Sequence, residues 1–252
     1  MISIHDLSFS YGKKLIFNGL TLDIPKGQFV SIIGPNGCGK STLLKLIGGD
    51  IDYQQGYISI EGKSLGEYST IEISKKLAFN RQNMNGLFPF TCLDYLLMGR
   101  RPHKKQFEDY TQDDFEKVEH VLKQTDTQNF LPKKLNEISG GELQRINVAK
   151  SLIQDTPYLL LDESFSAMDI YHTIGTLNLL KKLTQSGKTI VCVMHDLNLV
   201  YQFSDYVILF KQGKIYDTGA PNDVLKEKSI KDVYGIDVDY IDNRGFIFRG
   251  EM

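Results

Sequence analysis

Eight residues, GPNGCGKS at positions 34–41, constrain the fold of this chain more than any other stretch. They match the pattern G-x-x-x-x-G-K-S/T, with the apolar run FVSII before them and the helical run STLLKLI after them, which is the context that the pattern requires. Glycines at 34, 37 and 39 allow a tight turn whose N–H groups face one anion, and the next helix adds its dipole. The pattern predicts a phosphate-binding loop in which Lys40 reaches the β- and γ-phosphates of a nucleotide and the Ser41 hydroxyl faces Mg²⁺. Because such a loop presents its backbone, the Cys38 side chain is expected to take no part in the chemistry.

Two carboxylates end another apolar run, YLLLDE at 158–163. In a parallel sheet the C-terminal strand ends line the ligand crevice, so both side chains are expected there. Asp162 is predicted to hold Mg²⁺ through water. Glu163 is predicted to polarise the attacking water as a general base, a contribution of ~10²–10⁴-fold. The alternative, a strand that happens to end in two solvated acids, is less consistent with a phosphate loop in the same chain.

A second candidate anion site lies in SGGELQR, at 139–145. Ser139 and the N–H groups of Gly140 and Gly141 precede a helical pattern, and a helix start favours an anion through its dipole and its free N–H groups. Taken alone, the segment could also be a glycine pair that merely opens a helix.

Strands and helices alternate along most of the chain, which predicts an α/β fold with a mostly parallel sheet. The first 33 residues read as strands, and ISIHDLSFSY alternates polar and apolar residues. Residues 86–136 differ, because TCLDYLLMGR and TQDDFEKVEHVLKQT read as helices that each open with Thr and, three residues later, Asp. Hairpins are predicted at Gln212-Gly213 and in the stretch YIDNRGFIFRG. The sequence thus predicts an α/β core interrupted by a helical insertion.

Composition narrows the functional classes. With 252 residues, 41% hydrophobic and 24% charged, the chain reads as a globular protein, and its net charge of −2 gives no sign of a basic nucleic-acid face. Its cysteines, Cys38, Cys92 and Cys192, are scattered, which favours a reduced, intracellular setting. We expect no signal peptide, and no apolar run approaches the ~18 residues of a membrane span. If the protein works at a membrane, another chain is expected to supply the spans.

The phosphate loop, the LLLDE strand end and SGGELQR together resemble the ATP-binding-cassette (ABC) ATPases over nearly the whole chain. The resemblance implies a P-loop NTPase core formed by residues 1–85 and 137–252, N-terminal antiparallel strands, and an inserted helical subdomain at 86–136. It implies ATP and Mg²⁺ as cofactors. It also implies a head-to-tail homodimer, in which one chain covers the γ-phosphate bound to the loop of its twin. The covering residues are expected to be Ser139, Gly140, Gly141 and Glu142. The loop residues expected to contact ATP are Gly34, Pro35, Asn36, Gly37, Cys38, Gly39, Lys40, Ser41 and Thr42.

Three further positions match the family residue by residue. Tyr11 stands where the family has an aromatic ring against adenine, a stacking worth ~1–3 kcal/mol per base, and the alternative is a core tyrosine. Gln82 is similar to the glutamine that senses Mg²⁺ and the attacking water, and is expected to bind the metal with Ser41 and Asp162. His195 resembles the switch histidine that contacts the γ-phosphate, although a lone histidine is more often structural.

The segment SFSAMD resembles the loop that signals across the dimer, with Ser166 and Asp169 as its expected contact residues. Phe165 and Met168 depart from the PTSALD that family members often show. The string NRQ at 80–82 likewise replaces the usual apolar-Pro-Gln. These departures leave the detailed contacts of both segments open.

Longer strings point to a narrower group. FTCLDYLLMGRRPH, VMHDLN and GAPNDVLKEKSIKDVYGIDVDY are similar to the ATPase subunits of importers for iron-siderophore, haem and cobalamin complexes. The likeness implies a peripheral protein on the cytoplasmic face of the cell membrane. Its helical subdomain would grip integral membrane permease subunits, and an extracytoplasmic solute-binding protein would act indirectly. The transported solute touches those other chains, so this sequence does not identify it.

Other functional classes stay open. The chain could energise transport of another solute, or be a cassette ATPase that acts on nucleic acid or ribosomes, although its near-neutral charge argues against nucleic acid as a partner. A P-loop kinase or GTPase is a third class, but the guanine-reading string N-K-x-D is absent. Nucleic-acid stimulation of ATPase activity and a nucleotide competition assay would separate these classes.

Overall fold

The computed structural model describes residues 1–81, 90–241 and 245–249. The chain forms two compact units, Met1–Glu67 with Thr189–Met252, and Tyr68–Lys188. The predicted fold class is confirmed: parallel strands and helices form the core, and antiparallel strands lie at the N-terminus. The expected domain limits, after residues 85 and 136, stay a prediction.

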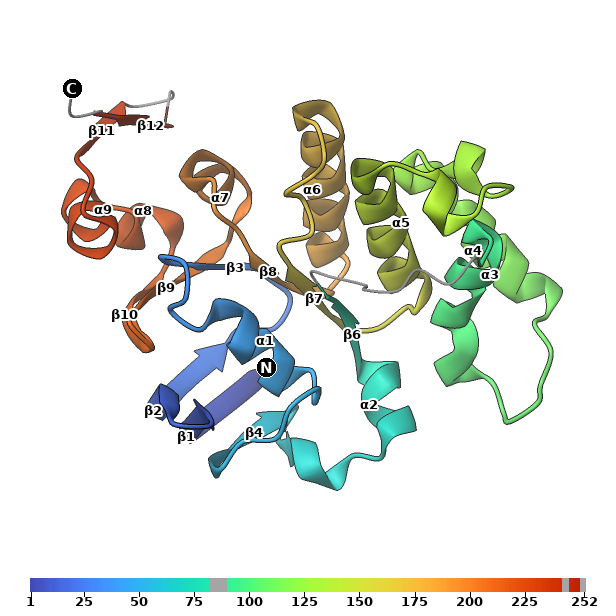
Figure 1. The fold of residues 1–252 in the computed structure, drawn as a ribbon, viewed down its shortest axis with the longest axis horizontal. Helices are drawn as coiled ribbons and strands as arrows, with labels where there is room; N and C mark the ends of the chain where they lie inside the picture. Colours follow the sequence, from blue (N-terminus) through green and yellow to red (C-terminus); the bar gives the residue numbers. More distant parts are fainter. Residues whose placement is uncertain (82–89, 242–244, 250–252) are drawn as a thin grey trace. The chain divides into compact units, whose positions relative to one another are not determined.

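The first unit opens with an antiparallel sheet in the order β2-β1-β4-β5 (Figure 1, where β1 and β2 are blue and β4 is cyan). Its strands are β1 (Ile2–Tyr11), β2 (Lys14–Ile24), β4 (Gln55–Ile60) and β5 (Lys63–Ser64). Buried and exposed residues alternate along the second half of β2, because one face of the sheet covers the core and the other faces water.

The parallel strands of this unit carry the phosphate loop. β3 (Phe29–Ile33) lies between β8 (Thr189–Val193) and β9 (Tyr206–Lys211), both parallel to it, and every residue of β3 and β8 is buried. β10 (Lys214–Gly219) returns antiparallel to β9. The turn at Gln212-Gly213, with φ of 49° and 75°, confirms the predicted hairpin.

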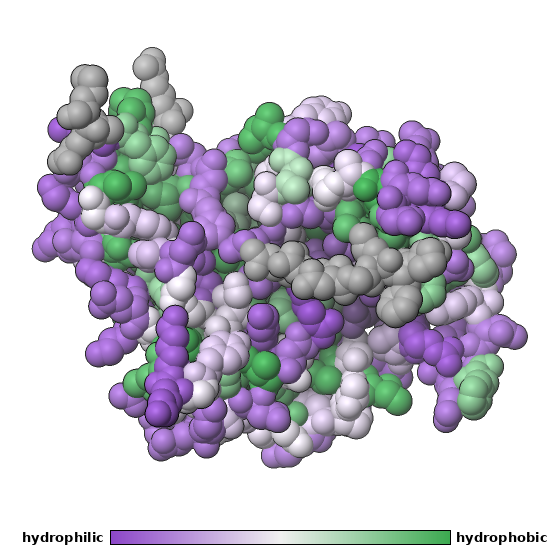
Figure 2. All heavy atoms as spheres, viewed as in Figure 1, coloured by the Kyte–Doolittle hydropathy of each residue, from purple (hydrophilic) through white to green (hydrophobic). Residues whose placement is uncertain are grey.

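Short helices and a second hairpin complete this unit. They are α7 (Leu197–Phe203), α8 (Pro221–Val224), α9 (Glu227–Tyr234), β11 (Val238–Ile241) and β12 (Gly245–Phe248). The β11–β12 pairing confirms the predicted C-terminal hairpin, whereas the three helices were not predicted. The rings of Tyr201, Tyr240 and Phe246 have centroids 5.3–5.9 Å apart, so the hairpin packs on α7. On the face shown in Figure 2, hydrophobic side chains gather beside this hairpin.

The second unit contains the parallel pair β6 (Leu77–Asn80) and β7 (Tyr158–Asp162). α2 (Thr70–Lys76) precedes β6, and α6 (Ile170–Gln185) follows β7. Gly187, with φ of 92°, lies just beyond α6, where glycine readily adopts the left-handed conformation that ends many helices. Between β6 and β7 the helical elements are α3 (Cys92–Leu97), η2 (Met98–His103), α4 (Gln112–Thr125), η3 (Gln128–Phe130), η4 (Leu135–Glu137) and α5 (Gly140–Ile153).

An apolar core holds α3, α4 and α5 together, and Figure 1 shows the three helices grouped. Its buried residues are Cys92, Tyr95, Leu96, Leu97, Val118, Val121, Leu122, Phe130, Leu135, Ile146, Ala149 and Ile153. The predicted helix starts are present: Thr91 Oγ1 accepts the Asp94 N–H at 3.1 Å, and Thr111 and Asp114 form a reciprocal capping box. Among the helices that the structure describes, none combines the length and the apolar character needed to cross a membrane.

Asp114 is also the centre of a buried ion cluster. Its carboxylate is 2% exposed and lies 3.0 Å from Arg100 Nε, 2.5 Å from Lys104 Nζ and 2.9 Å from the Thr111 N–H. Burial alone would raise the pKa of Asp114, but the hydrogen bonds from Lys104, Thr111 and Arg100 outweigh it and hold the pKa well below its usual value. The cluster fastens η2 to the start of α4.

Candidate functional site

The phosphate loop, residues 34–41, connects β3 to α1 (Lys40–Ile47). Gly34 has φ of 148°, and a Cβ there would lie 2.4 Å from the carbonyl oxygen of Phe210 in β9, so only glycine fits. Gly39 has φ of 109°, and a Cβ there would lie 2.7 Å from the Phe17 ring of β2. Two strands from different sheets of the unit, β9 and β2, therefore dictate the tight course of the loop.

The start of α1 is suited to an anion. Its N-cap residue, Gly39, has no side chain to cap the helix, and the first turn holds no acidic residue, so no carboxylate offsets the positive end of the dipole. Lys40 is 5% exposed, and its Nζ donates to the carbonyl oxygens of Gly34 at 2.7 Å and Pro35 at 3.0 Å. A cation therefore lies within the loop. Burial raises the pKa of the Cys38 thiol, although Lys40 opposes it, so the thiol stays protonated near neutral pH and is a poor nucleophile.

Tyr11 and His195 belong to the same unit as the loop. Tyr11 ends β1 and is 46% exposed, with its ring edge-on to Phe9 at 4.8 Å, so it is not a core tyrosine. His195 is exposed and follows β8, which runs parallel to β3 with Val193 opposite Ile32. Because both strands end at the same edge of the sheet, His195 leaves the sheet at the edge where the phosphate loop begins.

In the second unit, β7 ends in the two predicted carboxylates. Asp162 is 1% exposed, and Glu163 is half-buried with φ of 49°. A left-handed conformation costs a non-glycine residue about 1–3 kcal/mol, and such strain concentrates at functional positions. Asn80, at the end of β6, donates from Nδ2 to Ser164 Oγ at 3.0 Å, and Ser164 is buried. This contact anchors the chain directly after Glu163.

Ser139 begins α5 with a reciprocal capping box. The Glu142 carboxylate accepts the Ser139 N–H at 2.7 Å, and Ser139 Oγ accepts the Glu142 N–H at 3.3 Å. The Ser139 N–H and hydroxyl lower the pKa of Glu142, so this carboxylate is ionised at neutral pH. The exposed helix start therefore presents a serine hydroxyl and a glycine pair beside a negative charge.

The loop from Glu163 to Asp169 is held by hydrogen bonds between its own residues. Ser166 donates its N–H at 3.4 Å and its hydroxyl at 3.2 Å to the Glu163 carbonyl oxygen. The Met168 N–H donates to the Phe165 carbonyl oxygen at 3.1 Å, so the two residues that depart from the family pattern form a turn of their own. Asp169 then caps α6 by accepting the His172 N–H at 2.9 Å.

Gln82 lies outside the described residues, so its expected contacts with Mg²⁺ and water stay a prediction. Its neighbour Arg81 has its guanidinium 5.5 Å from the centroid of the Phe79 ring. Sequence reasoning missed Asn80 and Gln144 as residues of the site. Asn80 could have been found as a polar residue that ends a buried strand, as Asp162 does. Gln144 lies within the SGGELQR string itself.

Ser41 and Asp162 offer a hydroxyl and a carboxylate, and oxygen donors of this kind suit Mg²⁺, which usually keeps several waters and few protein ligands. Ser41 stands in the first turn of α1, and Asp162 is buried at the end of β7. These two residues therefore fit the expected metal.

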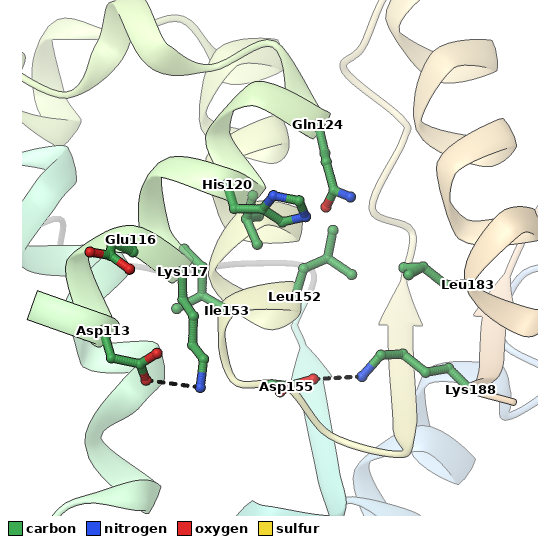
Figure 3. A pocket seen from close by; sticks show the side chains of 11 residues that line it. Asp113, Glu116, Lys117, His120, Gln124, Leu152, Ile153, Asp155, Leu183 and Lys188 are labelled. Carbon is green, nitrogen blue, oxygen red and sulfur yellow. Dashed lines mark hydrogen bonds and ion pairs between the residues drawn. The ribbon is translucent and has the colours of Figure 1, made fainter. Parts of the chain in front are cut away.

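A separate pocket of about 500 Å³ in the second unit is lined by α4 and the C-terminal ends of α5 and α6 (Figure 3). Both of its lysines are paired with acids: Lys117 Nζ lies 3.1 Å from Asp113, and Lys188 Nζ lies 2.9 Å from Asp155. Its floor includes the apolar Leu152. None of the predicted site residues that the structure describes lines this pocket, and its lysines are already neutralised, so it is not the predicted phosphate site.

Comparison with known proteins identifies the family. The family model described as ABC transporter matches residues 17–166, which include the phosphate loop, the SGGE segment and Glu163. The hemin import ATP-binding protein HmuV of Escherichia coli O157:H7 is 35% identical over 245 residues, covering 94% of this chain and 93% of that protein. The petrobactin import ATP-binding protein YclP of Bacillus subtilis (strain 168) is 33% identical over 247 residues, covering 97% of both chains.

Solved structures of ABC transporter proteins have the same fold as this chain. A chain from an ABC transporter in an inward-facing conformation superposes with a TM-score of 0.83 at 25% identity, covering 99% of this chain and 98% of that one. The dimeric cassette MJ0796, in a post-hydrolysis state bound to ADP and Pi, superposes with a TM-score of 0.78 at 29% identity, covering 88% of this chain and 99% of that one. With the family model, the relatives and the geometry of the loop in agreement, this chain belongs to the ABC transporter family, as one of its ATP-binding subunits.

Proposed function

We propose that this chain is the ATP-hydrolysing subunit of an importer for iron chelates of the siderophore or haem type, or for cobalamin. In this proposal two copies pair head to tail on the cytoplasmic face of the membrane, against integral permease subunits. The curated relatives described above carry names of hemin and petrobactin import, which supports the substrate class. The dimeric MJ0796 cassette with ADP and Pi supports pairing and hydrolysis.

The chain's own residues supply binding and proton transfer. Lys40 and the N–H groups of the loop hold the β- and γ-phosphates of ATP. Glu163 accepts a proton from water as the water oxygen attacks the γ-phosphorus, and the bond from that phosphorus to the β-phosphate oxygen breaks to leave ADP and phosphate. Ser41 and Asp162 would hold Mg²⁺, which neutralises charge on the phosphates when bound.

The second chain completes each site. Ser139 and the glycine pair of one copy cover the γ-phosphate held by the other, where they stabilise the charge that develops in the transition state. Hydrolysis removes the anion that bridges the copies, so they part. The helices α3 and α4 share one apolar core with α5, which supports a role as a rigid arm against the permease.

The observation that carries the proposal is the glycine loop that surrounds a buried Lys40 ammonium at an uncapped helix start. The test is Glu163→Gln, with Glu67→Gln, an exposed residue shortly after β5, as its matched control. Glu163→Gln should bind ATP like wild type while turnover falls by ~10²–10⁴-fold, the range for loss of a general base. Near-normal hydrolysis by Glu163→Gln would remove Glu163 from this role.

Two further measurements test the other parts of the proposal, the site shared between two copies and the substrate class. A wild-type monomer that hydrolyses ATP at full rate, when diluted far below any pairing, would refute the shared site. Co-purification with the membrane subunits, followed by identification of the bound solute, tests the substrate class, and a solute other than a metal chelate would refute it.

A further inference from the structure

Gln144, in the second turn of α5, joins this helix to the loop after β7. Its Oε1 accepts the Ala167 N–H at 2.8 Å, and its Nε2 donates to Ser166 Oγ at 3.0 Å. Gly141 permits this approach, because a Cβ there would lie 2.6 Å from the Ala167 carbonyl oxygen. One amide group therefore bridges two segments that lie 22 and 23 residues apart in sequence.

The direction of each hydrogen bond follows from the chemistry of the groups. A backbone N–H can only donate, so the Gln144 atom that faces Ala167 must be the amide oxygen. The amide nitrogen then faces Ser166 and donates to its hydroxyl oxygen. The hydroxyl hydrogen of Ser166 goes to the Glu163 carbonyl oxygen at 3.2 Å, which can only accept. A directed chain of hydrogen bonds thus runs from α5 through Ser166 to Glu163.

We propose that Gln144 is a positioning residue that couples the Ser139 end of α5 to Glu163. The inference rests on the proposed function, in which Ser139 contacts the ATP of the twin while Glu163 acts on the ATP of its own chain. Gln144 makes these two positions move together. Binding of ATP at one site therefore sets the position of the general base at the other, and the two sites hydrolyse cooperatively.

Two substitutions distinguish a role of Gln144 in positioning Glu163 from a role in merely attaching the loop after β7 to α5. Gln144→Met has a similar length but removes both hydrogen bonds. In Gln144→Glu the carboxylate still accepts from the Ala167 N–H and can accept the Ser166 hydroxyl, so the loop stays attached. That hydroxyl then no longer donates to Glu163, because a carboxylate cannot supply the hydrogen that Nε2 gave. Gln185→Met, at the exposed last residue of α6 and outside the helices expected to contact the permease, is the matched control.

The assay is steady-state ATP hydrolysis by the full-length chain in complex with its membrane subunits, over a range of MgATP concentrations. Misplacement of a catalytic group by about 1 Å can cost 10²-fold, so kcat should fall about 10- to 100-fold in both Gln144 variants, with KM changed less than about twofold. The Hill coefficient should fall to about 1 in both, while Gln185→Met keeps the wild-type values. Gln144→Glu should unfold near the wild-type temperature, which separates its effect from loss of stability.

Wild-type kcat and Hill coefficient in both Gln144 variants would overturn the inference. It would also be overturned if Gln144→Glu behaved as wild type and only a thermally weakened Gln144→Met lost activity, because that pattern means a structural role. These failures differ from failure of the proposed function, in which the wild-type complex itself would not hydrolyse ATP. Amide hydrogen exchange at residues 163–167 needs no nucleotide, and unchanged exchange in both variants would refute the positioning role in that case too.

Discussion

Gly140 and Gly141 are neighbours at the start of α5, but their surroundings differ. A Cβ at Gly141 would lie 2.6 Å from the Ala167 carbonyl oxygen, closer than real Cβ atoms come to any neighbour, whereas at Gly140 the nearest atom is Ala167 Cβ at 3.9 Å. The Gly141→Ala variant must therefore displace the backbone of the loop after β7. The Gly140→Ala variant meets only ordinary van der Waals contact, which makes it the matched control.

The two variants share one energetic term and differ in another. Both gain up to ~1 kcal/mol of helix propensity, because alanine loses less backbone entropy than glycine. Gly141→Ala alone overpacks its site, which typically costs about 1–3 kcal/mol. The shared gain cancels in the comparison, so Gly141→Ala should be less stable than Gly140→Ala by about 1–3 kcal/mol. At ~2–4 °C per kcal/mol for a chain of this size, the unfolding temperatures should differ by roughly 2–12 °C.

Thermal unfolding of the nucleotide-free chain, followed by circular dichroism, measures this difference. Turnover is a poor readout here, because both methyl groups enter the segment expected to contact ATP. Equal unfolding temperatures, or a lower one for Gly140→Ala, would refute the reasoning that the loop backbone rests against α5 at Gly141.

Three further predictions concern stability. Asp114→Asn should destabilise the chain by about 3–5 kcal/mol at pH 7, because it leaves the buried Arg100 without its counter-charge. The lowered pKa of Asp114 means that its contribution is present above about pH 4 and lost on acidification, so urea unfolding of wild type, but not of the variant, should show this loss. Burial, with the charge of Arg81 adding to it, lowers the pKa of Lys150 to about 8. Between about pH 8 and 10.4 the unfolded chain therefore binds more protons than the folded chain, and the free energy of unfolding should rise with pH across that window. Lys150→Met should abolish this rise, and a rise that persists would contradict the assignment. Gly245→Ala, at φ of 84° with its Cβ 2.3 Å from Asn198 Oδ1, should break the hydrogen bond from the residue 246 N–H to Asn198 and speed amide exchange there; unchanged exchange would argue against this contact.

Local chemistry explains what could be predicted about the fold. The helix starts at Thr91 and Thr111 and the turn at Gln212-Gly213 each depend on residues close in sequence, whose hydrogen bonds or φ preferences act wherever the segment lies. The short helices α7, α8 and α9, in contrast, were not predicted from the sequence. A few residues carry too little periodicity to identify a helix, and packing decides their conformation.

For the candidate site, too, the features that could be predicted are those set by residues close together in sequence. From the sequence alone came the phosphate loop with Lys40, the acids at the end of β7 and the glycine pair of α5, because each is a contiguous string whose spacing is itself the chemical requirement.

Only the tertiary structure decided that Asn80 holds Ser164, that Gln144 reaches Ser166, and that Asp114 is enclosed by cations from η2 and the loop after it. These partners lie between 10 and 84 residues apart in sequence. No local preference specifies such pairs, since they form only when the packing of strands and helices brings their side chains within hydrogen-bond distance.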